Sequence, residues 1–243
     1  MTRYPPPRFV DPEPYGFIYL GVQAEPAQRF PVHTRTPHRR REAAQLVAAA
    51  AALARRPDVA RVNVYRAVLI PPLPGVPRYN LAVLIRTVGA EQLDTVRACA
   101  EVSALGGEQI LAGVNAARIG DTEARTDGTF LFNHFTAGAG VDAEAVWRSL
   151  TGWYTSRTAV DNSTALRPAG ASPFALVNYV RLPAGPLRFL IGQLTRPSFH
   201  RFVRGTLDAN GMRALPAFHR LVHTCTAPTD DDLCSGGRQR DRG

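Results

Sequence analysis

The sequence contains no lysine, so all of its 29 basic side chains are arginines. Without a lysine the chain cannot form a Schiff base, which excludes the ordinary pyridoxal-phosphate and class I aldolase chemistries. It also cannot form a Walker A loop, whose lysine contacts the nucleotide phosphates. The missing lysine and the abundance of Ala, Gly, Pro and Arg together are typical of a GC-rich genome.

Basic charge nevertheless exceeds acidic charge, and the formal net charge is +9. A basic balance of this size can indicate nucleic-acid binding. The arginines are scattered along the chain, however, apart from Arg39–Arg41 and the C-terminal tail. We therefore interpret them as solvated surface charge and expect no nucleic-acid partner.

Long hydrophobic runs are also missing, since no segment reaches the ~18 apolar residues that span a bilayer. The longest candidate, 46–54, is short, rich in alanine and flanked by arginines. The N-terminal segment MTRYPPPRFVDPEPYG lacks the apolar core of a secretory signal. We expect a cytoplasmic protein without a membrane partner.

Cysteine is scarce, with only Cys99, Cys225 and Cys234, and no C-x-x-C pattern indicates a zinc ribbon or a thioredoxin-like site. Cys225 and Cys234 flank an acidic segment and could pair, but we expect free thiols in a reducing compartment. His219 and His223 are four residues apart in a segment that we expect to be a strand. There they would lie about 13 Å apart, too far to share an ion, so we predict no metal site.

Two common catalytic motifs are absent as well. No G-x-S-x-G elbow occurs, and no G-x-G-x-x-G follows a predicted strand. These absences exclude the usual hydrolase and dinucleotide-dependent dehydrogenase sites.

What the sequence does contain is a repeated order of elements. We divide the chain into a Pro-rich, loose N-terminal arm (1–14), a first unit (15–120), a second unit (121–223) and a disordered tail (224–243). Alternation and β-branched residues predict strands, and apolar periodicity with caps and breakers predicts helices. The predicted strands are 17–24, 59–70, 79–86, 109–119, 129–137, 164–167, 174–182 and 214–223. The predicted helices are 37–55, 91–105, 142–158, 186–194 and 198–207.

Each unit thus reads β-α-β-β-α-β, the ferredoxin-like order, at a spacing of roughly 110 residues. The best local parallel is YNLAVLIRTVGAEQLDTV against FALVNYVRLPAGPLRFLI. Two such sheets placed face to face close a barrel, because each sheet leaves one face without helices. We therefore predict an α+β fold made of two tandem ferredoxin-like units. In this order of elements, residues 17–223 resemble the dimeric α+β barrel superfamily, including EthD-like proteins and antibiotic-biosynthesis monooxygenases, as a fused pseudodimer.

The segment TDGTFLFNHFTAG opens the second unit and places an amide and an imidazole inside an apolar run. Side chains alternate along a strand, so Asn133 and His134 should point to opposite faces. Each could satisfy a neighbouring backbone group, or the inward one could orient a ligand in the barrel. Asn178 and Tyr179 form a second polar insertion, on a strand that should lie next to the first. Asn133 and Asn178 could form a satisfied core pair or the floor of a polar site.

The resemblance implies a small-molecule enzyme that acts on a hydrophobic or aromatic substrate inside the barrel by cofactor-independent oxygenation, isomerisation or cyclisation. We expect His134 and Asn133 to be catalytic and His134 to transfer a proton. The expected substrate contacts are Asn178, Tyr179, Arg204 and Trp147.

Two alternatives stay open. In the first, the barrel is a non-catalytic protein that binds a small hydrophobic ligand or forms assemblies, as a monomer or a homo-oligomer. In the second, the chain binds haem through His200, because chlorite dismutase-like and peroxidase relatives use a helix histidine as their haem ligand. The peroxidase signature G-x-x-D-G is absent here: Asp127-Gly128 matches its end, but no glycine stands three residues before Asp127. We therefore expect no resident cofactor.

Overall fold

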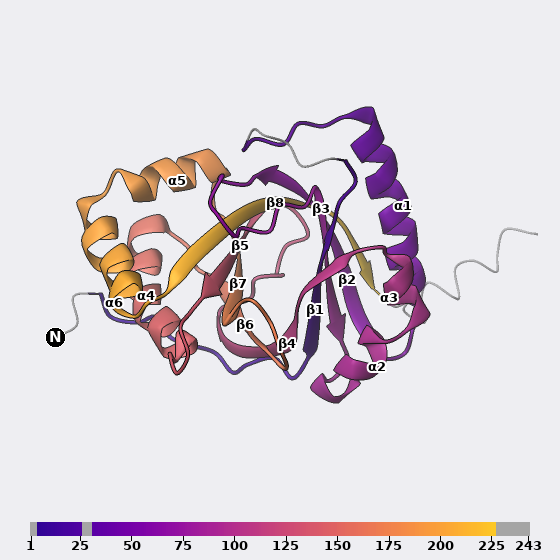
Figure 1. Ribbon diagram of the computed structural model, residues 1–243, viewed down its shortest axis with the longest axis horizontal. Coiled ribbons are helices and arrows are strands. Elements are labelled where there is room, and N and C mark those ends of the chain that lie inside the picture. Colours follow the sequence, from indigo (N-terminus) through magenta and orange to yellow (C-terminus); the bar gives the residue numbers. More distant parts are fainter. Residues whose placement is uncertain (1–3, 26–30, 227–243) are drawn as a thin grey trace, which may run out of the picture.

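The computed structural model describes residues 4–25 and 31–226, and its centre is a closed barrel of antiparallel strands. Helices cover the barrel on two opposite flanks (Figure 1). The strands are β1 (Gly16–Val22), β2 (Val59–Leu69), β3 (Leu81–Thr87), β4 (Glu108–Ile119), β5 (Thr129–Thr136), β6 (Ser163–Pro168), β7 (Leu176–Arg181) and β8 (Arg213–Thr226). The α-helices are α1 (Pro37–Leu53), α2 (Leu93–Arg97), α3 (Ala100–Ala104), α4 (Ala143–Thr158), α5 (Pro186–Leu194) and α6 (Gly205–Ala209). A 3₁₀ turn, η1 (Ala90–Gln92), precedes α2, and a π-helical turn, η2 (Phe199–Arg204), precedes α6.

The order of strands around the barrel is β1-β3-β2-β8-β5-β7-β6-β4. Within the first half the order is β4-β1-β3-β2, and within the second half it is β8-β5-β7-β6, the same pattern. The halves join where β2 pairs with β8 and where β6 pairs with β4. The second strand of each half therefore pairs with the fourth strand of the other half. This relationship confirms the predicted duplication and the closed α+β barrel.

Local sequence explains the helix boundaries. Thr36 caps α1 by accepting a hydrogen bond from the Arg39 amide at 3.1 Å, and Pro37 occupies the first turn, where its missing N–H is harmless. Asp142 caps α4 through the Ala145 amide at 2.9 Å. The single helix expected over 91–105 is wrong: the backbone is extended at Cys99, with ψ 155°, and divides the segment into α2 and α3.

Strand β8 extends beyond its predicted end. Residues 224–226, which we placed in the disordered tail, pair with β2, and Thr224 and Thr226 stand opposite Asn63 and Arg61. Cys225 is a buried free thiol on this strand. Cys234 lies outside the described residues, so its pairing stays a prediction.

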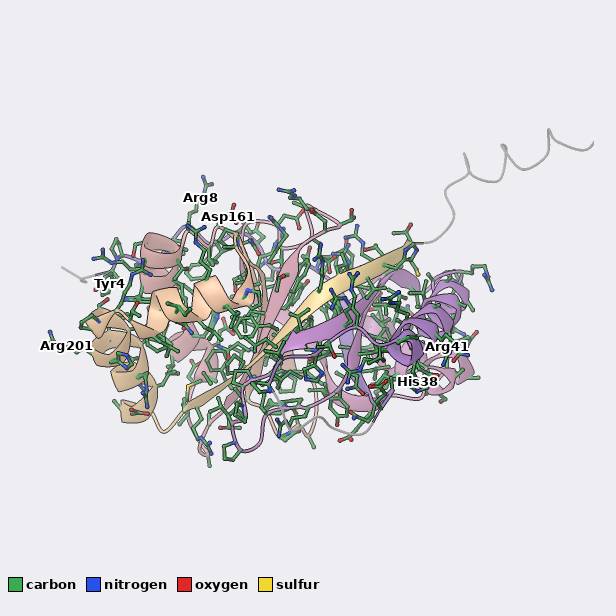
Figure 2. The ribbon with its side chains drawn as sticks, turned by 90° about the horizontal axis from the view of Figure 1, so that it is seen from above. Tyr4, Arg8, His38, Arg41, Asp161 and Arg201 are labelled. Atoms are coloured by element: carbon green, nitrogen blue, oxygen red, sulfur yellow. The ribbon has the colours of Figure 1, made fainter. Side chains whose placement is uncertain are left out.

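The described part of the N-terminal arm is packed rather than loose. The Tyr4 side chain is only 5% exposed and contacts the Phe202 ring, with ring centroids 4.8 Å apart. Phe9 packs near Trp147 of α4, and Val10 bridges to Arg118 of β4. Figure 2 shows Tyr4 at the end of the molecule that carries Arg201, opposite α1. The Pro-rich composition of the arm did not predict this packing, because it depends on two aromatic side chains, Tyr4 and Phe9.

Two layers of core result from strand alternation. The barrel interior is filled largely by aromatic side chains from both halves, among them Phe17, Tyr19, Tyr65, Phe130, Phe132, Phe174 and Tyr179. Alternate residues of the same strands point outward and pack under the helices. Within residues 4–25 and 31–226, no helix has the length and apolar character needed to cross a membrane.

Candidate functional site

Two adjoining cavities lie in the second half, between the outer face of the barrel wall and the helices that cover it. The inner cavity has a volume of about 40 Å³ and the outer one about 480 Å³. Their walls share Leu131, Asn133, Tyr154, Phe189 and Leu207. We call the two cavities together the helix-side cleft. The outer cavity is within the range of small-molecule sites, whereas the inner one holds little more than a water or two.

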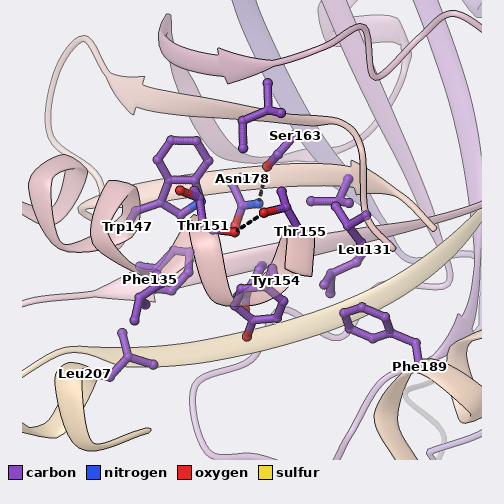
Figure 3. A pocket seen from close by; sticks show the side chains of 15 residues that line it. Leu131, Phe135, Trp147, Thr151, Tyr154, Thr155, Ser163, Asn178, Phe189 and Leu207 are labelled. Atoms are coloured by element: carbon purple, nitrogen blue, oxygen red, sulfur yellow. Dashed lines mark hydrogen bonds between the residues drawn. The ribbon is translucent and has the colours of Figure 1, made fainter. Parts of the chain in front are cut away.

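The walls of the cleft are mainly apolar and aromatic. Figure 3 shows Trp147 and Tyr154 of α4 and Phe189 of α5 around the inner cavity, facing the outward side chains of β5. These aromatic rings reach the cleft because α4 and α5 both lie over the second-half sheet. A flat apolar molecule fits such walls better than a polar one.

Asn133 lies at the floor of both cavities. Its side chain is 9% exposed, and its Oδ1 atom is buried without a hydrogen-bond partner in the described part of the chain. A buried amide oxygen in this state carries a desolvation cost that no protein contact offsets. A ligand O–H or N–H in the cleft would supply the missing partner.

Asn178 stands directly opposite Asn133 in the β5–β7 ladder, as its neighbouring strand position predicted. Its Nδ2 donates to Ser163 Oγ on β6 at 2.9 Å, shown as a dashed line in Figure 3. Thr155 Oγ1 donates to the Thr151 carbonyl at 3.2 Å, so that hydroxyl is also engaged. Of these polar groups, the Asn133 oxygen is the one left free for a ligand.

The mouth of the outer cavity carries charge. Arg204, Asp208 and Arg213 line it, together with Gln193, whose Oε1 is a second buried acceptor without a described partner. Burial raises the pKa of Tyr154 well above its ordinary value, so the phenol stays protonated at neutral pH. Within the described walls of the cleft, the titratable groups are therefore Tyr154, Arg204, Asp208 and Arg213.

His134 lies on the opposite face of β5, inside the barrel. Its Nδ1 donates to the Leu215 carbonyl at 2.9 Å, which fixes the neutral tautomer with a lone pair on Nε2. The ring stacks on Tyr19 at a centroid distance of 5.7 Å, and Nε2 has no described partner. Burial lowers the pKa of His134 to about 4. Tyr179 also faces inward, where burial raises its pKa.

One end of the barrel is closed by an ionic network that the sequence did not reveal. The Glu123 carboxylate contacts Arg61 at 2.8 Å and Arg86 at 3.2 Å, and accepts from Asn63 Nδ2 at 2.9 Å. Tyr179 Oη lies 3.4 Å from the same carboxylate. Residues distant in sequence meet here only because the barrel closes, so no local signal marks them.

His200 does not reach the cleft. It lies on η2 with an exposed side chain, and its Nε2 is bonded to the Leu194 carbonyl at 2.8 Å. None of the described residues that line the two cavities is a histidine. These residues do not fit a haem held by His200. Among the described residues, no group of three or more His, Cys, Asp or Glu side chains could hold a metal ion.

The predicted site residues therefore fall into two groups separated by the barrel wall. Asn133, Asn178 and Trp147 meet in the inner cavity, and Arg204 lines the outer one. His134 and Tyr179 face the packed interior instead. Tyr154 and Gln193 also line the cleft, although no sequence pattern predicted them as site residues. Their neighbours in the cleft come from other helices and strands, so the local sequence around each residue does not indicate a cavity.

Comparison with known proteins supports the fold. An anthrone oxidase-like protein of known structure superposes with a TM-score of 0.59 at 11% identity, over 88% of this chain and 94% of that chain. A putative chlorite dismutase superposes with a TM-score of 0.53 at 8% identity, over 86% of this chain and 95% of that one. No protein-family model matches the sequence, and no curated protein matches it. The strand order and these structural neighbours show a dimeric α+β barrel fold, with both halves supplied by one polypeptide.

Proposed function

We propose that the chain is a small-molecule enzyme whose substrate is an aromatic, largely apolar molecule bearing a hydroxyl or N–H group, bound in the helix-side cleft. The observation that carries the proposal is the buried, unpartnered Oδ1 of Asn133 at the floor of an aromatic-lined cleft. The apolar walls would bind the rings, and the amide oxygen would select molecules with a donor. This location replaces the barrel interior that we expected from the sequence.

The reaction class that we propose is oxygen-dependent oxidation in which the substrate supplies the electrons. The structural neighbour named as anthrone oxidase-like supports this class through the shared fold. An anthrone-type substrate loses two hydrogens and gains one oxygen atom from O₂ to give a quinone, while the second oxygen atom leaves as water. Asn133 would hold the substrate hydroxyl, and Arg204 in the wall would favour the electron-rich anion that reacts with O₂.

A second candidate function is binding without catalysis. It is favoured by the few titratable groups of the cleft, since its described walls contain no histidine, cysteine or glutamate and Asp208 is the one carboxylate that could serve there as a general base. Our prediction that His134 transfers a proton is retained as a separate proposal, because this residue faces away from the cleft. If His134→Ala turns over substrate at the wild-type rate, His134 takes no part in the mechanism.

The test of binding uses a matched pair of ligands, 1-naphthol and naphthalene, which differ only in the hydroxyl. Binding is followed by quenching of tryptophan fluorescence, since Trp147 lines the inner cavity. We expect 1-naphthol to bind about tenfold more tightly, and Asn133→Leu to remove this difference without weakening naphthalene. Equal affinity of both ligands for the wild type would contradict the proposed role of Asn133.

The test of catalysis measures oxygen uptake with anthrone as the substrate. Oxygen uptake faster than the uncatalysed rate, and slower in Arg204→Gln and in Asn133→Leu than in the wild type, would support the proposed enzyme activity. Naphthol binding without oxygen uptake supports the binding protein instead. Failure of both ligands to bind overturns both functions.

A further inference from the structure

A separate cavity of about 480 Å³ lies in the first half, between the N-terminal part of α1 and strands β2 and β8. Four arginines line it: Arg35, Arg39, Arg40 and Arg66. We call this cavity the arginine groove. Figure 2 labels His38 and Arg41 of α1 on this flank, at the opposite end of the molecule from Arg201. The groove shares no lining residue with the helix-side cleft.

Positive charge in the groove is largely uncompensated. No aspartate or glutamate belongs to its described walls. Arg39 pairs with Glu25 at 2.7 Å, but Arg35, Arg40 and Arg66 form no ion pair with a described residue. Burial, together with Arg35 and Arg220, lowers the pKa of Arg66 from its ordinary value, as expected where positive groups crowd together.

Two buried donors in the wall also lack partners. Arg39 is 7% exposed; its Nε and Nη1 donate to Glu25 and to the Thr34 carbonyl, while Nη2 has no partner among the described residues. Asn80 is 2% exposed, and its Oδ1 accepts from the Glu25 amide at 2.8 Å, which identifies the free Nδ2 as the donor. Buried donors in proteins are nearly always paired. Both unpaired atoms require an acceptor, and neither could serve a cation.

Apart from Thr34 and His223, the rest of the groove lining is apolar. Ala43 and Val47 of α1 face Leu221 and Val222 of β8 across it. The register between β2 and β8 shifts where Leu221 pairs with Tyr65 and His223 pairs with Val64, so Val222 is an extra residue in the ladder. A bulge of this kind redirects side chains and here turns apolar groups into the wall.

We propose that the arginine groove binds a small organic anion, with its carboxylate or phosphate on the arginines and on Asn80 and its apolar portion against α1 and β8. Guanidinium groups bind both kinds of oxyanion by paired, charge-assisted hydrogen bonds. The volume of the groove, about 480 Å³, accommodates a short-chain acid or phosphate ester. Such a ligand would not occupy the helix-side cleft. This site is independent of the proposed oxidation, so either can fail without the other.

The experiment titrates the full chain with hexanoate, hexyl phosphate and 1-hexanol by isothermal titration calorimetry at low ionic strength. The three probes share a chain, and 1-hexanol lacks the charge. We expect one or both anions to bind about tenfold or more tightly than 1-hexanol, and to weaken as salt is added. The tighter anion identifies the headgroup as carboxylate or phosphate.

Variants locate the binding. Asn80→Asp keeps the acceptor for the Glu25 amide but replaces the free donor with a negative oxygen, so it should weaken the anion by about tenfold or more. Arg66→Gln should act in the same direction. Arg97→Gln, an exposed arginine of α2 paired with Asp94, removes the same charge elsewhere and should leave affinity unchanged. Circular dichroism checks that each variant is folded.

Two results would overturn the proposal. One is binding of 1-hexanol as tight as that of both anions, including the case in which none of the three binds. The other is an equal loss of anion affinity in Arg97→Gln and Arg66→Gln, which would show that overall charge rather than the groove attracts the anion.

Discussion

Asn133 and Asn178 face each other across the β5–β7 ladder, yet only one of the two amides is engaged. Asn178 donates to Ser163, while the Asn133 oxygen is buried without a described partner. Removing an unpaired acceptor relieves its desolvation cost, so Asn133→Leu should raise the free energy of unfolding by about 1–2 kcal/mol. Urea denaturation of the ligand-free protein measures the change.

The same pair supplies a control. Asn178→Leu breaks the bond to Ser163 and should lower the free energy of unfolding by about 1 kcal/mol. A variant that is more stable but binds 1-naphthol less well would show that Asn133 is retained for ligand binding rather than for packing. Destabilisation by Asn133→Leu would instead indicate a structural amide.

Stability should fall as the pH is lowered from about 6.5 to about 4, because of two buried histidines. Burial lowers the pKa of His134 to about 4 and that of His219 to about 3. Over this range the unfolded chain binds protons that the folded chain does not, so the folded state loses free energy relative to the unfolded state. Each histidine should contribute up to roughly 3 kcal/mol to this loss.

Urea denaturation at pH 7 and at pH 4.5 tests this dependence. His134→Phe and His219→Phe should each flatten it, because phenylalanine binds no proton. His38→Gln is the matched control, since His38 is exposed on α1 and should leave the slope unchanged. An unchanged slope in both phenylalanine variants would assign the acid sensitivity to other groups, such as His33, whose pKa is also lowered by burial to about 4.

Glu123→Gln should destabilise the barrel by about 2–3 kcal/mol, because it leaves two partly buried guanidinium groups without their shared carboxylate. Glu123 is 6% exposed at its side chain, and Arg61 and Arg86 both contact it. Asp127→Asn, which removes an exposed pair with Arg125, should change stability by less than about 1 kcal/mol. Thermal unfolding of the two variants gives the comparison, and equal effects would show that the network is solvent-screened.

Gly152→Ala should weaken the docking of the N-terminal arm. A Cβ atom at Gly152 of α4 would lie only 2.3 Å from the Pro5 carbonyl oxygen and 2.6 Å from that of Tyr4. The arm must therefore shift, and we expect faster proteolysis within residues 4–14 although alanine favours the helix itself. Gly192→Ala on α5 meets no atom closer than 3.8 Å and should stabilise by about 0.5–1 kcal/mol. Unchanged proteolysis in Gly152→Ala would show that the arm can yield without detaching.

The sequence by itself determined the order of elements, the duplication and the opposite orientation of Asn133 and His134. These features depend on local periodicity, on caps such as Thr36 and Asp142, and on the alternation of side chains along a strand. Tertiary structure decided which face holds a cavity. Aromatic side chains from both halves fill the barrel interior around His134, and the cavities beside Asn133 lie between the outer face of the sheet and the helices α4 and α5. The arginine groove and the Glu123 network likewise join residues from separate elements, whose proximity follows from barrel closure and from no local pattern.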